Sequence, residues 1–231
     1  MAATVTPIRT ELPELPQYMC ELPIFRGYPV PWFVDWFNGE PEFRAMDMNK
    51  FVRAVNQRLC WVCGHKLYTE EVFVVGPMCG VNRVSSEPPS HRECAVYSAR
   101  GCPFLSRPSM ERREGNLPGP RKEPAGIMVS RNPGVSLLWY TRRHRLIESA
   151  HIPKAGAHRG ILFSMGYPHK VEWYREGRPA TRAEVWESIE SGLPLLYEAN
   201  EKQGGGAEHL AEGRAMIDKQ LAETMRLLPR A

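Results

Sequence analysis

The hydrophobic positions of this chain change period from segment to segment. Residues 48–59 place their apolar side chains at helical spacing, directly after Asp47, a residue type that caps helix N-termini well. The run 71–76 is β-branched and aromatic and is typical of a strand. Ser90 favours the start of a second helix, which we expect to continue towards Gly101. The first half of the chain therefore predicts a helix, a strand and another helix.

The second half carries two further apolar and aromatic stretches, at residues 134–147 and 159–177, and both predict strands. A last helix is predicted over residues 207–228, where apolar residues repeat along one side. Short strands separated by helices, in a chain rich in proline and glycine, favour an α+β fold.

A capping box marks one more helix between these strands and the last helix. Thr181 is followed three residues later by Glu184, and an apolar stripe comes next. Gly192 predicts the end of this helix, because glycine is common just after a helix C-terminus and Pro194 follows it closely.

Two pairs of metal-ligand residues stand out in the first half. Cys60 and Cys63 form a Cys-x-x-Cys turn, and His91 and Cys94 form a His-x-x-Cys pair at the start of a predicted helix. Sulfur and imidazole ligands in such close pairs are typical of zinc sites. A cysteine turn, a strand or hairpin and a helix whose first turn completes the site resemble a treble-clef zinc finger. Four good ligands also predict a closed, structural zinc ion.

Two other cysteines leave the ligand set open. Cys79 or Cys102 would complete a four-cysteine site if His91 pointed elsewhere. A metal-dependent nuclease of the ββα-metal type shares the same frame and remains an alternative. Its histidine base and additional metal ligands would have to come from His65, Asn82 or His91.

Positive charge is concentrated around and after the cysteines. Residues 60–150 hold thirteen lysines and arginines against eight acidic residues, in a chain whose net charge is +4. Nucleic acid is the partner that such an excess favours. The residues that we expect to contact phosphates are Arg142, Arg143 and Arg145, together with Arg112 and Arg113 in a predicted linker.

Four segments are predicted from these features. They are a proline-rich arm (1–31), a treble-clef-like zinc-binding domain (32–105), a linker (106–125) and a small α+β domain ending in a helix (126–231). The N-terminus has acidic residues and prolines where a signal peptide would be apolar, and no apolar run reaches the ~18 residues that span a bilayer. We therefore expect a cytoplasmic protein without a membrane partner.

The stretches LCWVCG, GPMCGVNRVSSEPPSHRECAVYSARGCPFL and VEWYREGRPATRAEVWESIESGLPLL resemble segments of uncharacterised bacteriophage and prophage proteins. This resemblance implies the cytoplasm of a bacterial host and brings no known activity. The leading hypothesis is a zinc-stabilised, non-enzymatic binding protein that acts on DNA, RNA or a nucleic-acid-processing machine. Besides the nuclease, the other alternative is a protein-interaction module that binds a host or phage protein through its proline-aromatic arm.

Overall fold

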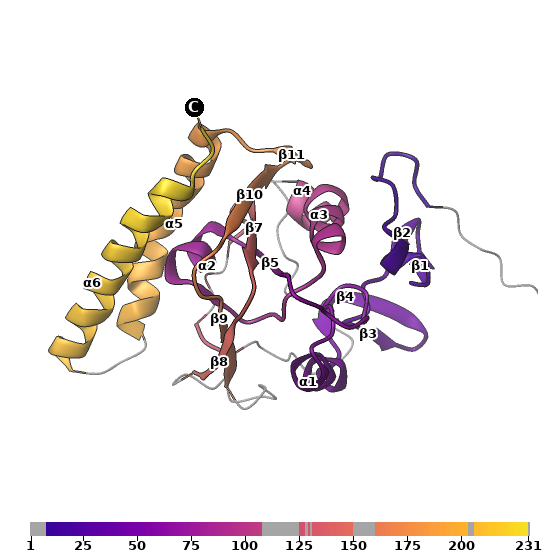
Figure 1. Cartoon of the computed structure of the whole chain (residues 1–231), viewed down its shortest axis with the longest axis horizontal. Coiled ribbons are helices and arrows are strands. Elements are labelled where there is room, and N and C mark those ends of the chain that lie inside the picture. The colour runs from indigo at the N-terminus through magenta and orange to yellow at the C-terminus, as the bar shows by residue number, and fades with distance from the viewer. Residues whose placement is uncertain are drawn as a thin grey trace, which may run out of the picture.

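A four-stranded antiparallel sheet forms the centre of the protein in the computed structural model, which describes residues 8–107, 125–127, 129, 131–149, 160–202 and 206–230. The sheet order is β11–β10–β7–β5 (Figure 1). Its strands are β5 (Glu71–Val75), β7 (Ser136–Thr141), β10 (Lys170–Arg175) and β11 (Arg178–Pro179). Every residue of β7 is buried, which explains why its central residues 137–140 are all apolar or aromatic and do not alternate with polar ones.

Helices cover both faces of this sheet (Figure 1). One face carries α2, and the long helices α5 and α6 pack on α2, whereas α3 and the short α4 lie on the other face. Their bounds are α2 (Pro77–Asn82), α3 (Arg92–Gly101), α4 (Pro103–Ser106), α5 (Arg182–Lys202) and α6 (Ala207–Thr224), the last followed by the 3-10 turn η2 (Met225–Leu227). The protein is thus a mixed α/β structure in layers.

The sheet joins parts of the chain that the sequence assigns to different domains. β5, from the segment 32–105, pairs along its whole length with β7, from the segment 126–231. The largest hydrophobic cluster also combines both segments and includes Phe51 and Leu228. One sheet and one core therefore cross the predicted boundary. Residues 108–124 of the predicted linker, with Arg112 and Arg113, lie outside the described residues.

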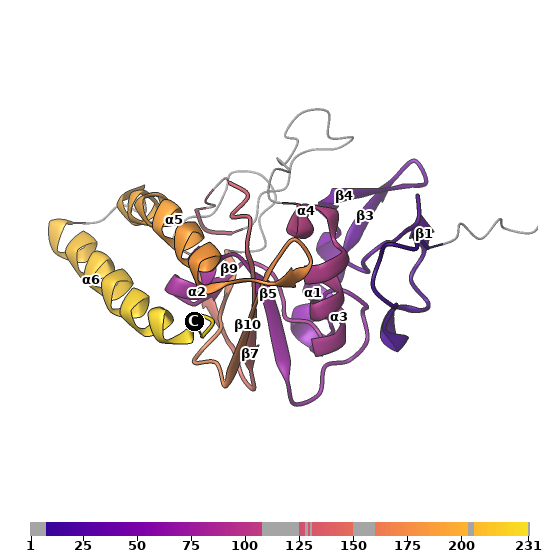
Figure 2. The same ribbon diagram turned by 90° about the horizontal axis from the view of Figure 1, so that it is seen from above.

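Smaller elements surround this central unit. The β1–β2 hairpin of the arm and the α5–α6 pair lie at opposite ends of the molecule (Figure 2). Asp47 accepts hydrogen bonds from the Asn49 and Lys50 backbone N–H groups, which confirms it as the N-cap of α1. The bounds are η1 (Gln17–Met19), β1 (Ile24–Phe25), β2 (Tyr28–Pro29), β3 (Val34–Phe37), β4 (Glu40–Met46), α1 (Met48–Gln57), β6 (Val84–Ser85), β8 (Arg145–Glu148) and β9 (Ile161–Ser164).

The predicted end of the helix after Thr181 is wrong. The capping box is present, since the Glu184 carboxylate accepts from the Thr181 backbone N–H. However, α5 continues through Gly192 and Pro194 to Lys202. A Cβ at Gly192 would lie 3.0 Å from the Met78 sulfur, so this glycine allows α2 and α5 to approach closely and does not terminate the helix. Burial further along α5 then outweighs the unfavourable proline.

No helix in the described ranges is long and apolar enough to cross a lipid bilayer. α5 and α6, the longest of them, have charged residues along their length and bury only one side.

Candidate metal centre

The structure brings together the four residues of the two predicted ligand pairs. The ligand atoms of Cys60, Cys63, His91 and Cys94 all lie within 4.8 Å of one another. All four residues are buried, with at most 7% of their surface exposed. Three thiols and one imidazole at these separations form a Cys₃His group that could hold one metal ion.

Backbone hydrogen bonds shape the turn that presents the two first ligands. The Gly64 N–H donates to the Cys60 carbonyl at 2.8 Å, and the Cys60 N–H donates to the His65 carbonyl at 2.7 Å. Gly64 adopts a positive φ of 77°, a conformation that glycine tolerates best. It also lies against the Trp32 ring, where a Cβ would come within 2.7 Å of a ring carbon. Local backbone hydrogen bonds therefore form the Cys-x-x-Cys turn, and the Trp32 ring packs against it at Gly64.

The second ligand pair lies at the N-terminus of α3. The N-cap of this helix is one residue later than the sequence predicts. His91, and not Ser90, is the N-cap, because the Ser90 backbone forms a bridge with Val72 of β5 through two hydrogen bonds. Cys94 follows in the first turn of the helix, where the helix dipole favours a thiolate. The bridge to β5 thus fixes the start of α3 beside the cysteine turn.

The orientation of His91 determines which of its nitrogens faces the sulfurs. Its Nε2 lies 3.0 Å from the Lys66 carbonyl oxygen, and since a carbonyl only accepts, Nε2 carries the proton. Its Nδ1 lies 3.3 Å from the Cys63 sulfur. A ligating histidine that donates its other N–H to a carbonyl is the usual arrangement in metal sites. Nδ1 is accordingly the atom available to a metal ion.

Proton affinities in the group reflect the crowding of its sulfurs. Burial alone would raise the pKa of the Cys60 thiol, but hydrogen bonds with its three neighbours bring that pKa well below its ordinary range. Hydrogen bonds with Cys60 and Cys63, together with burial, raise the pKa of Cys94. Burial would lower the pKa of His91, whereas its bonds to the two sulfurs raise it to about 10. A divalent cation would replace these protons, since metal ligands bind deprotonated.

The proline-rich arm covers one side of this group. Met19, in η1, is 1% exposed and packs in the same hydrophobic cluster as the three cysteine ligands. The Tyr18 ring stacks on the His91 ring, with centroids 4.4 Å apart and planes 12° apart. Residues before the cysteine turn therefore shield the site from solvent.

The remaining described cysteines lie outside the group. Cys79 and Cys102 are not among the residues that surround the site. Cys79 packs at the edge of the main core, where burial raises the pKa of its thiol to about 11. Burial likewise raises the pKa of Cys102, which precedes α4. Both thiols are therefore less prone to ionise than an ordinary cysteine, which suits a packing role.

The three residues named for a nuclease do not form a second site in the structure. Both ring nitrogens of His91 have partners at the metal centre. The Asn82 side chain accepts a hydrogen bond from the Val84 backbone N–H. His65 is exposed, and its ring lies 5.8 Å from that of Tyr18. These positions give the nuclease alternative no specific support.

Three of the arginines predicted to contact phosphates are exposed in and just after the turn between β7 and β8: Arg142, Arg143 and Arg145.

His144 lies between these arginines and takes part in a buried polar contact that the sequence did not predict. His144 Nδ1 lies 2.7 Å from a carboxylate oxygen of Glu71, and the other oxygen accepts from Arg58 at 2.8 Å. The only signal in the sequence was an acidic residue at the head of an apolar strand.

Comparisons with protein-family models, with curated proteins and with solved structures return no match to this chain. Its function must therefore be inferred from the geometry of its own residues.

Proposed function

We propose that this protein is a zinc-stabilised nucleic-acid-binding protein of phage type, with the β7–β8 turn as its phosphate-binding surface. The observation that carries the proposal is that three neighbouring arginines have no partner for their guanidinium groups among the described residues. Within the described part of the chain, the guanidinium groups of Arg142, Arg143 and Arg145 form no hydrogen bond or ion pair, whereas Arg44, Arg58, Arg83 and Arg178 are each paired with a carboxylate.

Zinc is the metal that suits the group of three cysteines and one histidine. It prefers thiolate and imidazole ligands in a tetrahedron, and four protein ligands leave no position for water. We therefore assign the ion a structural role, in a treble-clef-like arrangement of cysteine turn, β5 bridge and α3. Bound zinc would hold the cysteine turn to α3, and α3 packs on the central sheet.

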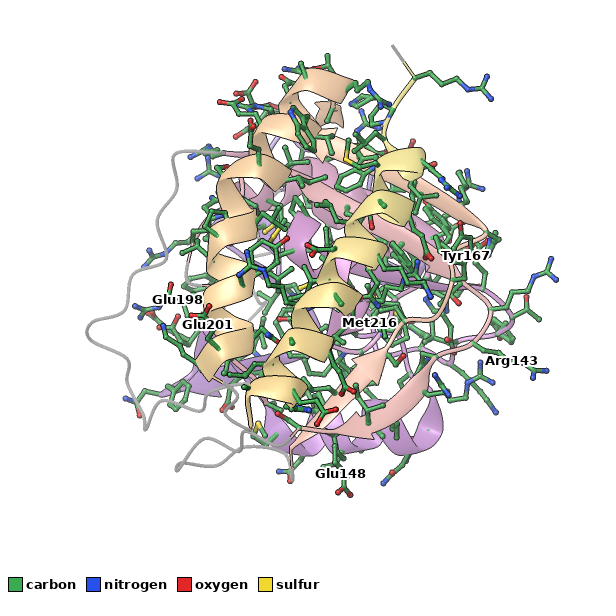
Figure 3. The ribbon with its side chains drawn as sticks, turned by 90° about the vertical axis from the view of Figure 1, so that its left-hand side faces the viewer. Arg143, Glu148, Tyr167, Glu198, Glu201 and Met216 are labelled. Carbon is green, nitrogen blue, oxygen red and sulfur yellow. The ribbon has the colours of Figure 1, made fainter. Side chains whose placement is uncertain are left out.

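The position of the arginines supports a phosphate-binding role. The β7–β8 turn leaves the central sheet next to the three-stranded sheet β6–β9–β8, and Arg143 projects from the edge of the molecule, away from α5 and α6 (Figure 3). Gathering three cations that have no carboxylate partner among the described residues costs stability through their mutual repulsion. A polyanion would relieve this repulsion, and each arginine that contacts a phosphate would release a counterion.

Binding to labelled single-stranded RNA and to duplex DNA across a series of salt concentrations tests this proposal. We expect the affinity to fall as salt rises, and we expect the R142Q/R143Q/R145Q variant to reduce the slope of log K against log salt by about 2 to 3. A control variant, K219Q/R226Q/R230Q, removes the same charge from exposed positions near the C-terminus. If both triple variants weaken binding equally, the turn is not the site; if no binding is found, the proposal fails.

A further inference from the structure

His144 is held in one orientation by a buried carboxylate. Its Nδ1 lies 2.7 Å from Glu71, whose side chain is only 2% exposed. A carboxylate can only accept, so the imidazole donates from Nδ1. Hydrogen bonds from His144 and Arg58 offset the burial of Glu71 and lower the pKa of its carboxyl, which keeps the partner of His144 negatively charged.

Aromatic contacts further restrict the imidazole. The His144 ring lies edge-on to Phe163, at 5.3 Å between centroids, and edge-on to Phe73, at 5.8 Å. Its side chain is 18% exposed. Among the described residues, Nε2 has no hydrogen-bond partner. The histidine is therefore oriented through one nitrogen while the other is open to a ligand, as in the base–orienter pairs of hydrolytic enzymes.

We propose that His144 is a general base for the cleavage of RNA bound at the β7–β8 turn. Nε2 takes the proton of a ribose 2′-hydroxyl, and the 2′-oxygen attacks the adjacent phosphorus. The bond from phosphorus to the 5′-oxygen breaks, and that oxygen takes a proton from water. The products are a 2′,3′-cyclic phosphate and a 5′-hydroxyl, and the imidazolium returns its proton to solvent. Neither an oxidant nor a further co-reactant is needed.

The chemistry around His144 selects RNA over DNA. In the described part of the chain, no serine, threonine or cysteine side chain is hydrogen-bonded to Nε2, so the attacking oxygen comes from the substrate or from water. RNA carries a hydroxyl next to each phosphate, and such proximity gives an internal nucleophile a large rate advantage. The flanking guanidinium groups of Arg143 and Arg145 would stabilise the charge that develops on the phosphate oxygens. Glu71 is the positioning residue.

The inference rests on the proposed nucleic-acid binding, and its test keeps the two separable. The full chain is incubated with a DNA oligonucleotide that contains one central ribonucleotide, and with the same oligonucleotide methylated at that 2′-oxygen. We expect cleavage only of the first, with a 2′,3′-cyclic phosphate found by mass spectrometry. H144N, whose amide can still donate to Glu71, should reduce the rate by about 100-fold or more while the affinity changes less than about threefold.

A second variant separates positioning from folding. E71Q should slow cleavage with little change in KM, and E71D, which keeps a carboxylate, should recover part of the lost rate. Equal rates for E71Q and E71D would contradict the positioning role. If the wild-type chain binds RNA but leaves the ribonucleotide intact, or if H144N cleaves like wild type, the catalytic role is overturned while the binding function stands. Absence of any binding overturns both.

Discussion

The Tyr18 ring stacks face to face on the imidazole of His91, with centroids 4.4 Å apart. Tyr18 comes from the N-terminal arm and is 39% exposed, whereas His91 is a buried member of the metal-ligand group. The arm thus covers the metal centre with a side chain that itself faces solvent.

Loss of this cover should make the metal easier to remove. We expect Tyr18→Ala to accelerate transfer of zinc to a chromogenic chelator by about three- to tenfold, because an aromatic pair contributes about 0.5–1.5 kcal/mol. Tyr68→Ala, at a tyrosine that is 67% exposed, serves as the control. Equal transfer rates in the two variants would contradict a shielding role for Tyr18.

The metal itself should be necessary for the fold. Elemental analysis of protein purified under reducing conditions is expected to give about one zinc ion per chain, because four ligands bind a single ion. Cys94→Ser should lose most of that zinc and reduce the free energy of unfolding by at least about 3 kcal/mol, as measured by urea denaturation.

Cys79→Ser is the control for the loss of a thiol outside the ligand group, at a half-buried position. It should keep its zinc, because Cys79 lies outside the ligand group. Comparable zinc loss in both variants would mean that the ligand set is wrong.

Gly64 should tolerate alanine far less well than Gly39. Both glycines have positive φ, at 77° and 82°, so each substitution carries a backbone cost of about 1–2 kcal/mol. Only at Gly64 would the new Cβ overlap the Trp32 ring, whereas nothing lies within 4 Å at Gly39. We expect Gly64→Ala to be the more destabilising by a further ~1–3 kcal/mol in thermal or urea unfolding. Similar losses in the two variants would show that Trp32 moves aside.

Acid should weaken the contact between Glu71 and His144. The pKa of Glu71 is lowered in the folded chain, so its contribution is complete above the unfolded value of ~4.3 and is lost as pH falls through the lower folded value. We expect Glu71→Gln to reduce the free energy of unfolding by about 1–3 kcal/mol at pH 7, with the difference from wild type shrinking below pH ~4.3.

Glu70→Gln provides the control for this titration. Glu70 pairs with His169, but its side chain is 41% exposed, so we expect little effect at any pH. A wild-type advantage over Glu71→Gln that stays constant down to pH ~3 would contradict the assignment.

Much of the local structure followed from short sequence patterns. Asp47 caps α1, and the capping box at Thr181 begins α5, because the hydrogen bonds of a helix start involve neighbours three or four residues apart. The four residues that could hold a metal ion were found for the same reason, since each pair is defined by a two-residue spacing. The end of α5 was predicted wrongly because Gly192 is needed for close packing against α2, and α2 is distant in sequence.

By itself, then, the sequence determined the two ligand pairs, the starts of α1 and α5 and the segments that form β5, β7 and β10, because their hydrogen bonds and spacings are local. Only the tertiary structure decided that β5 and β7 are neighbours, and with them the contact between Glu71 and His144, which lie 73 residues apart. Such pairings depend on which arrangement of all the apolar segments buries the most surface, and no single stretch of the chain carries that information.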